Sequence, residues 1–208
     1  MRGARVAAIV LAAGESRRMG ESLKALLPWH GMPLVLYQTR ELLAAQVDDI
    51  IVVVGHRAIE VEQALAELEP DPRVRLVRND RYQDGKITSI RAGLEAIEKS
   101  PEAIIIIAVD QPRPRAILTR LLTAHDENVR VGRRITLPVR EGRRGHPPIF
   151  SGDLLPELLD LREETEGLRA VLRGHEDEIG EVEIDDPIVL VDCNTPEEYE
   201  SAYERFGG

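Results

Sequence analysis

Short, uninterrupted apolar runs alternate with amphipathic stretches along the first two thirds of the chain. The apolar runs are rich in β-branched residues and predict strands at 6–11, 50–54, 74–77, 104–109 and 135–139. Strands that are apolar at every position have both faces covered, as in a parallel sheet between helices. The stretches between them space Leu, Ala and Ile as helices do, at 34–46, 59–68, 87–99 and 114–126. We therefore expect an α/β protein, a three-layer αβα sandwich around a Rossmann-like, mostly parallel sheet with right-handed crossovers.

The pattern loosens after residue 140. Residues 140–148 are rich in glycine, proline and charge, but apolar Ile149 follows so soon that they indicate a loop rather than a linker. Beyond it we expect helices at 152–161 and 167–175, a strand at 179–184, a short apolar run at 188–191 and a final helix. That helix should begin at Pro196 with Thr195 as its N-cap. A length of 208 residues suits one domain spanning 1–208.

Composition narrows the class of protein. A hydrophobic fraction of 43% and a charged fraction of 31% are those of a soluble globular chain. No apolar run approaches the roughly 20 residues of a membrane span, and 6–11 is too short for a signal sequence, so we expect a cytoplasmic protein. The single cysteine, Cys193, excludes an internal disulfide and a thiolate cluster. A net charge of −10 and an aromatic content of 3% disfavour nucleic acid as a partner.

Residues 9–24, IVLAAGESRRMGESLK, pass from an apolar run into a turn of small residues and then to cations. Small residues let the main chain approach phosphate oxygens, and Arg17, Arg18 and Lys24 supply positive charge, so the segment is a candidate phosphate-binding loop. Its spacing fits neither G-x-x-x-x-G-K-[ST] nor G-x-G-x-x-G. We expect Arg17 to be a solvated or supporting residue.

Acidic and amide side chains follow two later apolar runs. Asp110 ends the most apolar segment, AIIIIAVDQP, at the edge of the sheet where parallel strands place ligands. Mg²⁺ prefers one or two protein oxygens together with phosphate and water, so Asp110 is a candidate ligand, although it could instead cap the next helix. Asn194 is the candidate second ligand, with Asp192 acting through water; an Asx-type turn before Thr195 is the alternative.

The five histidines, at 30, 56, 125, 146 and 175, lack Ser, Cys or carboxylate partners at helpful spacing. Acid–base and nucleophilic machinery is therefore not evident. Nucleotidyl transfer needs neither, because its phosphate nucleophile is already anionic and catalysis reduces to alignment and charge neutralisation.

Several motifs in order carry a family resemblance. They are L-A-A-G-x-S-R-R-M-G at 11–20, D-G-K-I-T-S-I-R-A-G-L at 84–94, D-Q-P at 110–112, G-H-P-P-I-F at 145–150, G-L-R-A-V-L at 167–172 and D-C-N-T-P at 192–196. Together they resemble the nucleotidyltransferases that move NMP from an NTP to an acceptor phosphate, and most of all the molybdenum-cofactor (molybdopterin) cytidylyltransferase group. The sheet would then be of the nucleotide-diphospho-sugar transferase type.

The resemblance implies a Mg²⁺-dependent transfer of CMP from CTP to a phosphorylated acceptor, with molybdopterin as the expected acceptor, and release of pyrophosphate. It implies catalytic roles for Arg18, Lys24 and Asp110, and a metal site at Asp110 and Asn194. The implied nucleotide contacts are Leu11, Ala12, Ala13, Gly14, Glu15, Ser16, Arg18, Lys24 and Ser89. Ala13 favours CTP, because guanylyl-transferring relatives have glycine there, although uridylyl-transferring ones share alanine. Ser89 could contact the base or simply be a polar residue in a first helical turn.

For the acceptor, the resemblance implies contacts from His146 and Arg169, either of which could instead be a surface residue. The nucleotide part would cover about 1–112 and the acceptor part about 113–208. A molybdoenzyme or a cofactor chaperone is the protein partner implied. One departure is that Lys24 stands one residue later than the family's lysine, which leaves its aim open.

Three other functions stay open. They are transfer to a sugar or alcohol phosphate, an inactive NTP-binding regulatory domain, and a dinucleotide-dependent oxidoreductase, which the missing G-x-G-x-x-G disfavours.

Overall fold

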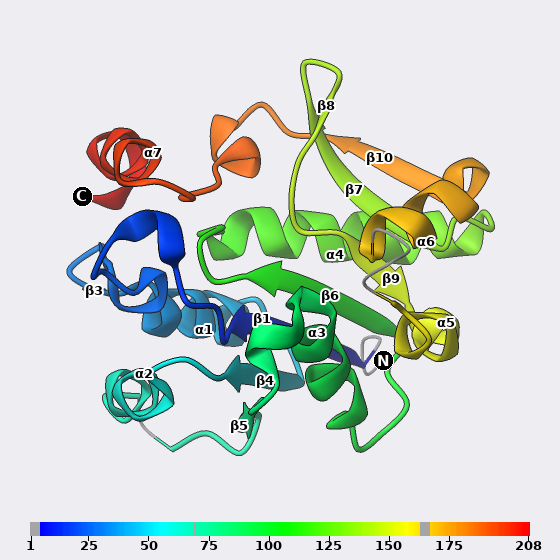
Figure 1. The fold of residues 1–208 in the computed structure, drawn as a ribbon. Coiled ribbons are helices and arrows are strands. Elements are labelled where there is room, and N and C mark those ends of the chain that lie inside the picture. Colours follow the sequence, from blue (N-terminus) through cyan, green and yellow to red (C-terminus); the bar gives the residue numbers. More distant parts are fainter. Residues whose placement is uncertain (1–4, 69, 163–166) are drawn as a thin grey trace.

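A computed structural model describes residues 5–68, 70–162 and 167–208. Its central sheet runs in the order β10-β7-β9-β6-β1-β4-β5, with β8 paired to β7 (Figure 1). Its strands are β1 (Val6–Ala12), β4 (Asp49–Val54), β5 (Val74–Arg78), β6 (Ala103–Ala108), β7 (Ile135–Arg140), β8 (Arg143–Arg144), β9 (Ile149–Ser151) and β10 (Ile179–Glu183). Strands β5, β4, β1 and β6 are mutually parallel, so the expected mostly parallel sheet is confirmed.

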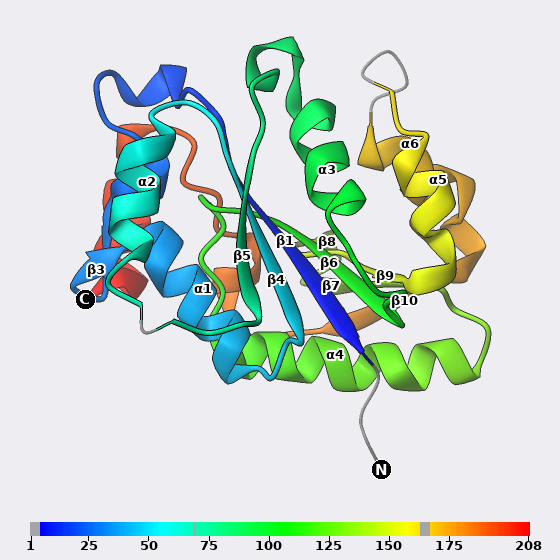
Figure 2. The ribbon, with the colours of Figure 1, turned by 90° about the horizontal axis from the view of Figure 1, so that it is seen from below.

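Helices cover both faces of this sheet (Figure 2). One face packs against α1 (Leu34–Ala44), α2 (Ala58–Leu65) and α4 (Arg115–Arg130), and the other against α3 (Lys86–Glu95), α5 (Leu155–Leu159) and α6 (Leu168–Gly174). Along β1, Ala8 and Val10 belong to the first core, whereas Ile9 and Leu11 belong to the second. This two-sided burial explains why the strand is apolar at every position, and the three-layer α/β sandwich is confirmed.

The second half departs from the expected pattern. Strand β9 is antiparallel to both β6 and β7, which makes the sheet mixed. The apolar run at 188–191 is not extended but forms most of a 3₁₀ turn, Pro187–Leu190, whose first residues are fixed by Asp186 accepting the Ile188 N–H at 3.0 Å. The helix expected at 152–161 is a 3₁₀ turn followed by the short α5. A small hairpin, β2 (Pro28–Trp29) and β3 (Met32–Pro33), was not expected.

The strand order creates a crevice beside β1. The chain first builds outward from β1 through β4 to β5 and then crosses to β6 on the other side of β1. In open α/β sheets, ligands bind outside the carboxyl ends of the strands at such a reversal. Leu11 near the end of β1 is in register with Ala108 at the end of β6. The turn after β1 and the segment holding Asp110 therefore emerge side by side.

Among the described residues, no helix combines the length and the apolar character needed to cross a membrane. The division of the chain at about residue 112 stays a prediction.

Candidate functional site

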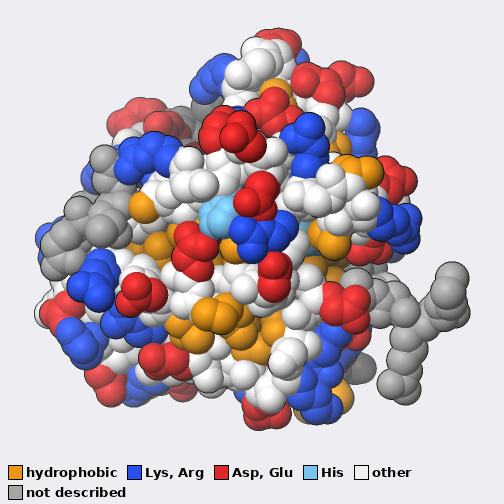
Figure 3. Space-filling model, turned by 90° about the vertical axis from the view of Figure 1, so that its right-hand side faces the viewer, with side chains coloured by type: hydrophobic (Ala, Val, Ile, Leu, Met, Phe, Trp, Pro, Cys, Tyr) orange, Lys and Arg blue, Asp and Glu red, His pale blue; other side chains and the backbone are white. Residues whose placement is uncertain are grey.

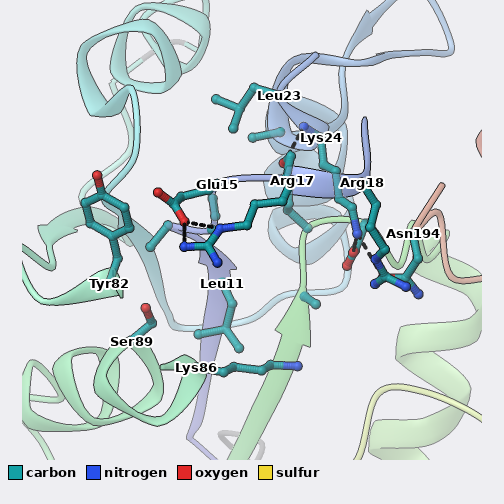
Figure 4. Close-up of a pocket in the computed structure, with 18 of the residues that line it drawn as sticks. Leu11, Glu15, Arg17, Arg18, Leu23, Lys24, Tyr82, Lys86, Ser89 and Asn194 are labelled. Carbon is teal, nitrogen blue, oxygen red and sulfur yellow. Dashed lines mark hydrogen bonds and ion pairs between the residues drawn. The ribbon is translucent and has the colours of Figure 1, made fainter. Parts of the chain in front are cut away.

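A cleft of about 520 Å³ opens at the carboxyl ends of β1 and β6 (Figure 4). It is lined by every residue predicted to act in catalysis, nucleotide binding or metal binding, namely Leu11, Ala12, Ala13, Gly14, Glu15, Ser16, Arg18, Lys24, Ser89, Asp110 and Asn194. His146 and Arg169 are not among the lining residues. The structure thus brings the predicted nucleotide and metal residues together and leaves the predicted acceptor residues apart from them.

On one wall of the cleft, two cationic side chains contact two side-chain oxygens. The Lys24 ammonium donates to Asp110 Oδ2 at 2.5 Å and to Asn194 Oδ1 at 2.9 Å, and the Arg18 guanidinium donates to Asn194 Oδ1 at 2.8 Å. Arg18 is exposed to the cleft, while the Lys24 and Asp110 side chains are each 13% exposed. Figure 4 shows Arg18, Lys24 and Asn194 on the same side of the site. Elements from both ends of the chain therefore converge on one point.

The turn after β1 shapes this wall. Ser16 adopts a left-handed conformation with φ of 54°, and a 3₁₀ turn over Arg17–Met19 follows it. The Ser16 hydroxyl accepts the Lys24 backbone N–H at 3.0 Å, which fixes where the lysine leaves the loop. At Gly14 a Cβ would meet nothing within 4 Å, so the main chain is open to a ligand there. The extra residue before Lys24 does not prevent its Nζ from reaching Asp110.

Neither Asp110 nor Asn194 caps the helix that follows it. Helix α4 has Pro114 as its N-cap, and the Asp110 carboxylate bonds Lys24 instead of a helix terminus. Helix α7 (Pro196–Ala202) is capped by Thr195 in a capping box with Glu198, as expected for Thr195, and this leaves the Asn194 amide free to face the cleft. The Cys193 N–H donates to the Asp110 carbonyl at 2.9 Å, which ties the two segments together.

Cys193 itself has no chemical role that the structure supports. Its thiol is buried, and burial raises its pKa to about 12, so it is not a thiolate at neutral pH.

The opposite wall comes from the segment before α3 and from its first turns. Tyr82, Gln83, Gly85, Lys86 and Ser89 line it. The Ser89 hydroxyl accepts from Asn79 Nδ2 at 2.9 Å, which leaves its proton available to a ligand. Lys86 extends across the cleft in Figure 4 and forms no ion pair with any residue that the structure describes. No role was predicted for it from the sequence, although it is the third residue of the motif at 84–94.

Glu15 links the two walls at the mouth of the cleft. Its carboxylate accepts from Gln83 at 3.0 Å and from Arg17 at 2.7 Å, and these hydrogen bonds lower its pKa. The Arg17 side chain is 79% exposed, in accord with the supporting role expected for it.

The oxygen donors fit a hard divalent cation. Asp110 and Asn194 already converge on a single positive atom, the Lys24 Nζ, and Asp192 lines the same cleft. Among the described residues, no cluster of three or more His, Cys, Asp or Glu side chains could cage a metal. Two protein oxygens that must be completed by phosphate and water are the donor set typical of Mg²⁺.

Two histidines have surroundings that their spacing did not suggest. His146 lies beyond the lining residues; burial, followed by the nearby Arg113 charge, lowers its pKa. His175 contacts Glu157 at 2.7 Å and Glu178 at 3.2 Å, so the expectation that no histidine has a carboxylate partner was wrong. This cluster lies on a face where acidic and basic side chains intermingle (Figure 3) and takes no part in the cleft.

Taken together, the doubly covered, mostly parallel sheet and the glycine turn that faces a carboxylate and an amide form the arrangement typical of nucleotide-binding α/β proteins. The sequence-family model of the MobA-like NTP transferase domain matches residues 8–179 of the chain. The chain belongs to that family.

The relatives and the solved structure that are similar to this chain carry different activities in their names. The chain is 33% identical to nicotine blue oxidoreductase of Paenarthrobacter nicotinovorans, over 81% of each chain. It is 26% identical to the molybdenum cofactor cytidylyltransferase of Escherichia coli K12, over 95% of each. It is 33% identical to a probable molybdenum cofactor guanylyltransferase of Methanosarcina acetivorans, over 78% of this chain and 69% of that one. A solved nucleotidyl transferase from Methanothermobacter thermautotroptrophicus superposes with a TM-score of 0.81 at 30% identity, covering 98% of both chains.

Proposed function

We propose that this protein transfers CMP from CTP to a phosphorylated acceptor in a Mg²⁺-dependent reaction that releases pyrophosphate, with molybdopterin as the acceptor. The observation that carries the proposal is the convergence of Arg18 and Lys24 with Asp110 and Asn194 in one cleft. The two cations and the glycine turn can bind the phosphates of a nucleotide, and the two oxygens can bind the metal ion that accompanies a triphosphate.

Each residue on this wall has a task in that reaction. Asp110 and Asn194 would hold Mg²⁺, which would supply neutralisation of the triphosphate's negative charge. Arg18, exposed at the rim, would clamp the β- and γ-phosphates with its planar fork. Lys24 would leave its present contacts and neutralise charge on the α-phosphate. The acceptor phosphate is an anion near neutral pH, so alignment and charge carry the catalysis without a general base.

The base end of the cleft favours a pyrimidine. Ala13 lines the cleft at a position where the guanylyl-transferring relatives have glycine, as the resemblance of 11–20 implies, and Ser89 offers a hydroxyl to the base. A guanylyltransferase among the relatives makes GTP the nucleotide to test against CTP.

The two proposed acceptor contacts lie outside the lining of the cleft. His146 stands near the cleft's charges, because Lys86 and Asp110 both act on its pKa, whereas Arg169 is an exposed residue of α6. We keep both as acceptor contacts, with a molybdoenzyme or cofactor chaperone as the protein that would receive the product.

A dinucleotide-dependent oxidoreductase is the second candidate, favoured by the relative named nicotine blue oxidoreductase. The turn after β1, L-A-A-G-E-S-R-R-M-G, lacks the G-x-G-x-x-G of dinucleotide folds. Its cations instead suit a triphosphate.

Ligand-induced thermal stabilisation separates these candidates. The purified protein is heated with Mg²⁺ and CTP, GTP, UTP, ATP or NADPH. A ligand at 100 times its Kd adds about 2.7 kcal/mol to stability, so CTP should raise Tm by about 5–11 °C in a protein of this size. Stabilisation by NADPH and by none of the four triphosphates would contradict the proposal.

Turnover is then tested with CTP and molybdopterin, a sugar phosphate or an alcohol phosphate as acceptor, by measuring pyrophosphate. The Asp110→Asn variant keeps the side chain's shape and removes its charge, so it should fold normally and lose turnover. Binding of CTP without pyrophosphate from any acceptor would indicate the inactive regulatory domain instead.

A further inference from the structure

A fully buried arginine lies behind the cleft, three residues after Asp110. Arg113 is 0% exposed, and its guanidinium donates to four backbone carbonyls. Nε bonds His146 O at 2.8 Å, Nη1 bonds Pro112 O at 2.8 Å, and Nη2 bonds Val189 O at 3.0 Å and Val191 O at 2.9 Å. Among the described residues, no carboxylate forms an ion pair with it.

This arrangement is costly for stability alone. Burying a charge without an opposite partner is strongly unfavourable, and apolar side chains of similar size commonly serve a core as well or better. Burial lowers the pKa of Arg113 to about 10, so the group is still charged at neutral pH. The nearby Asp192 and Asp110 offset part of the cost. Because burial of this charge is unfavourable for stability, we look to the neighbouring site for the role of Arg113.

Three of the four carbonyls, those of Pro112, Val189 and Val191, lie close in sequence to Asp110 or Asn194, and the fourth, His146 O, belongs to the loop before β9. Pro112 lies two residues after Asp110, and Val191 lies three residues before Asn194. The two segments also meet directly, since the Cys193 N–H donates to the Asp110 carbonyl. The segment from 187 to 195 contains a 3₁₀ turn rather than a strand, so no sheet ladder fixes its place. Backbone hydrogen bonds hold it at two points, from His146 N–H to Val189 O and from Cys193 N–H to Asp110 O, and the planar fork of Arg113 adds donors to Val189 O and Val191 O.

We propose that Arg113 is a positioning residue that holds the Asn194 segment against Asp110, so that both side-chain oxygens face one cation. The metal part of this inference rests on the proposed function; the positioning part does not. Lysine cannot replace arginine here, because its single ammonium nitrogen cannot occupy the positions of the three guanidinium nitrogens that bond these carbonyls.

The first test uses nucleotide-free protein and amide hydrogen exchange. In Arg113→Lys, the Cys193 amide should exchange at least about 10-fold faster than in wild type, because its segment opens locally. Amides of β1 should be unchanged. The matched control is Leu158→Ala, a buried residue of α5 in the core on the other face, which lowers global stability without touching these loops. Equal Cys193 exchange in Arg113→Lys and wild type would overturn the proposal.

The second test measures Mn²⁺ affinity in the presence of CTP, from the electron paramagnetic resonance signal of the free ion. Arg113→Lys should weaken Mn²⁺ binding by about 10- to 100-fold, the usual effect of removing a group that orients metal ligands. Leu158→Ala should bind as wild type does. Unchanged affinity in Arg113→Lys, together with a Tm loss like that of Leu158→Ala, would reduce Arg113 to a structural role.

A failure of the proposed function can be distinguished from a failure of the positioning role of Arg113. If wild type binds no Mn²⁺ with CTP, the proposed function is wrong, and hydrogen exchange still decides whether Arg113 positions the segment.

Discussion

Replacing Lys24 by methionine tests how the cation wall is held together before any ligand arrives. The Lys24 ammonium contacts both Asp110 and Asn194, the two residues proposed above as metal ligands. Methionine keeps most of the side chain's apolar stem and removes its charge. The substitution should therefore destabilise the ligand-free protein and, at the same time, let a metal ion bind without nucleotide.

The size of both effects follows from the same contact. The Lys24 and Asp110 side chains are each 13% exposed, so solvent screens the pair less than it would a surface pair. Hydrogen bonds to charged groups contribute about 1.5–3 kcal/mol, and water in the cleft can rehydrate Asp110, so we take about 2 kcal/mol. In a domain of this size that loss lowers Tm by about 4–8 °C. A metal ion entering wild type must displace the same contact, and about 2 kcal/mol corresponds to about 30-fold in affinity.

The assay is a titration with Mn²⁺ alone, followed by electron paramagnetic resonance, combined with thermal scans in chelator and in Mn²⁺. Lys24→Met should bind Mn²⁺ about 30-fold more tightly than wild type, and the ion should recover its lost Tm. Lys86→Met is the matched control, because it removes one cation from the opposite wall without touching either oxygen ligand. Equal Mn²⁺ affinity in Lys24→Met and wild type would refute the reasoning.

Three further changes probe the base end, the core and a surface cluster. Ala13→Gly introduces the residue of the guanylyl-transferring relatives into the lining of the cleft, which should shift the ratio of kcat/KM for CTP and GTP toward GTP by about 10-fold or more; an unchanged ratio would count against Ala13 as a selector. Gly152→Ala would place a Cβ 1.8 Å from Pro101 O, so chemical denaturation should show a loss of about 1–3 kcal/mol, whereas wild-type stability would mean that this backbone moves freely. The hydrogen bond from Arg134 lowers the pKa of Glu178 to about 2, so its stabilising effect is present above the ordinary glutamate pKa and is lost as pH falls toward 2. Tm of Glu178→Gln and wild type should therefore converge in acid; a constant difference down to pH 2 would contradict this.

Much of the fold could be predicted because the central strands are apolar at every position. The run containing Ile9 and Val10 is buried on both faces, so every position in it must be apolar, and an uninterrupted apolar run is easily recognised in a sequence. Strand β9 could not be found this way, since three residues carry too little pattern. Residues 188–191 were harder still, because apolar burial is the same in a strand and in a 3₁₀ turn.

The candidate site divides in a similar way. Arg18 and Asp110 stand beside strand ends, where local sequence already implies a shared edge of the sheet. Arg113 gave no such signal, because an arginine in a proline-rich stretch reads as exposed, and its burial depends on carbonyls from segments 33 to 78 positions away. A role for Lys86 could not be predicted for a related reason, because the local sequence does not show that the start of α3 faces the turn after β1.

Arg18 and Asn194 touch although 176 positions separate them along the chain. During synthesis from the N-terminus, β1, its glycine turn and the neighbouring strands leave the ribosome long before Asn194 does. A growing chain would thus carry the arginine and lysine of the loop without the amide oxygen that they share in the finished protein. Ligand-binding competence should appear abruptly, only after the segment around Asn194 has emerged and docked.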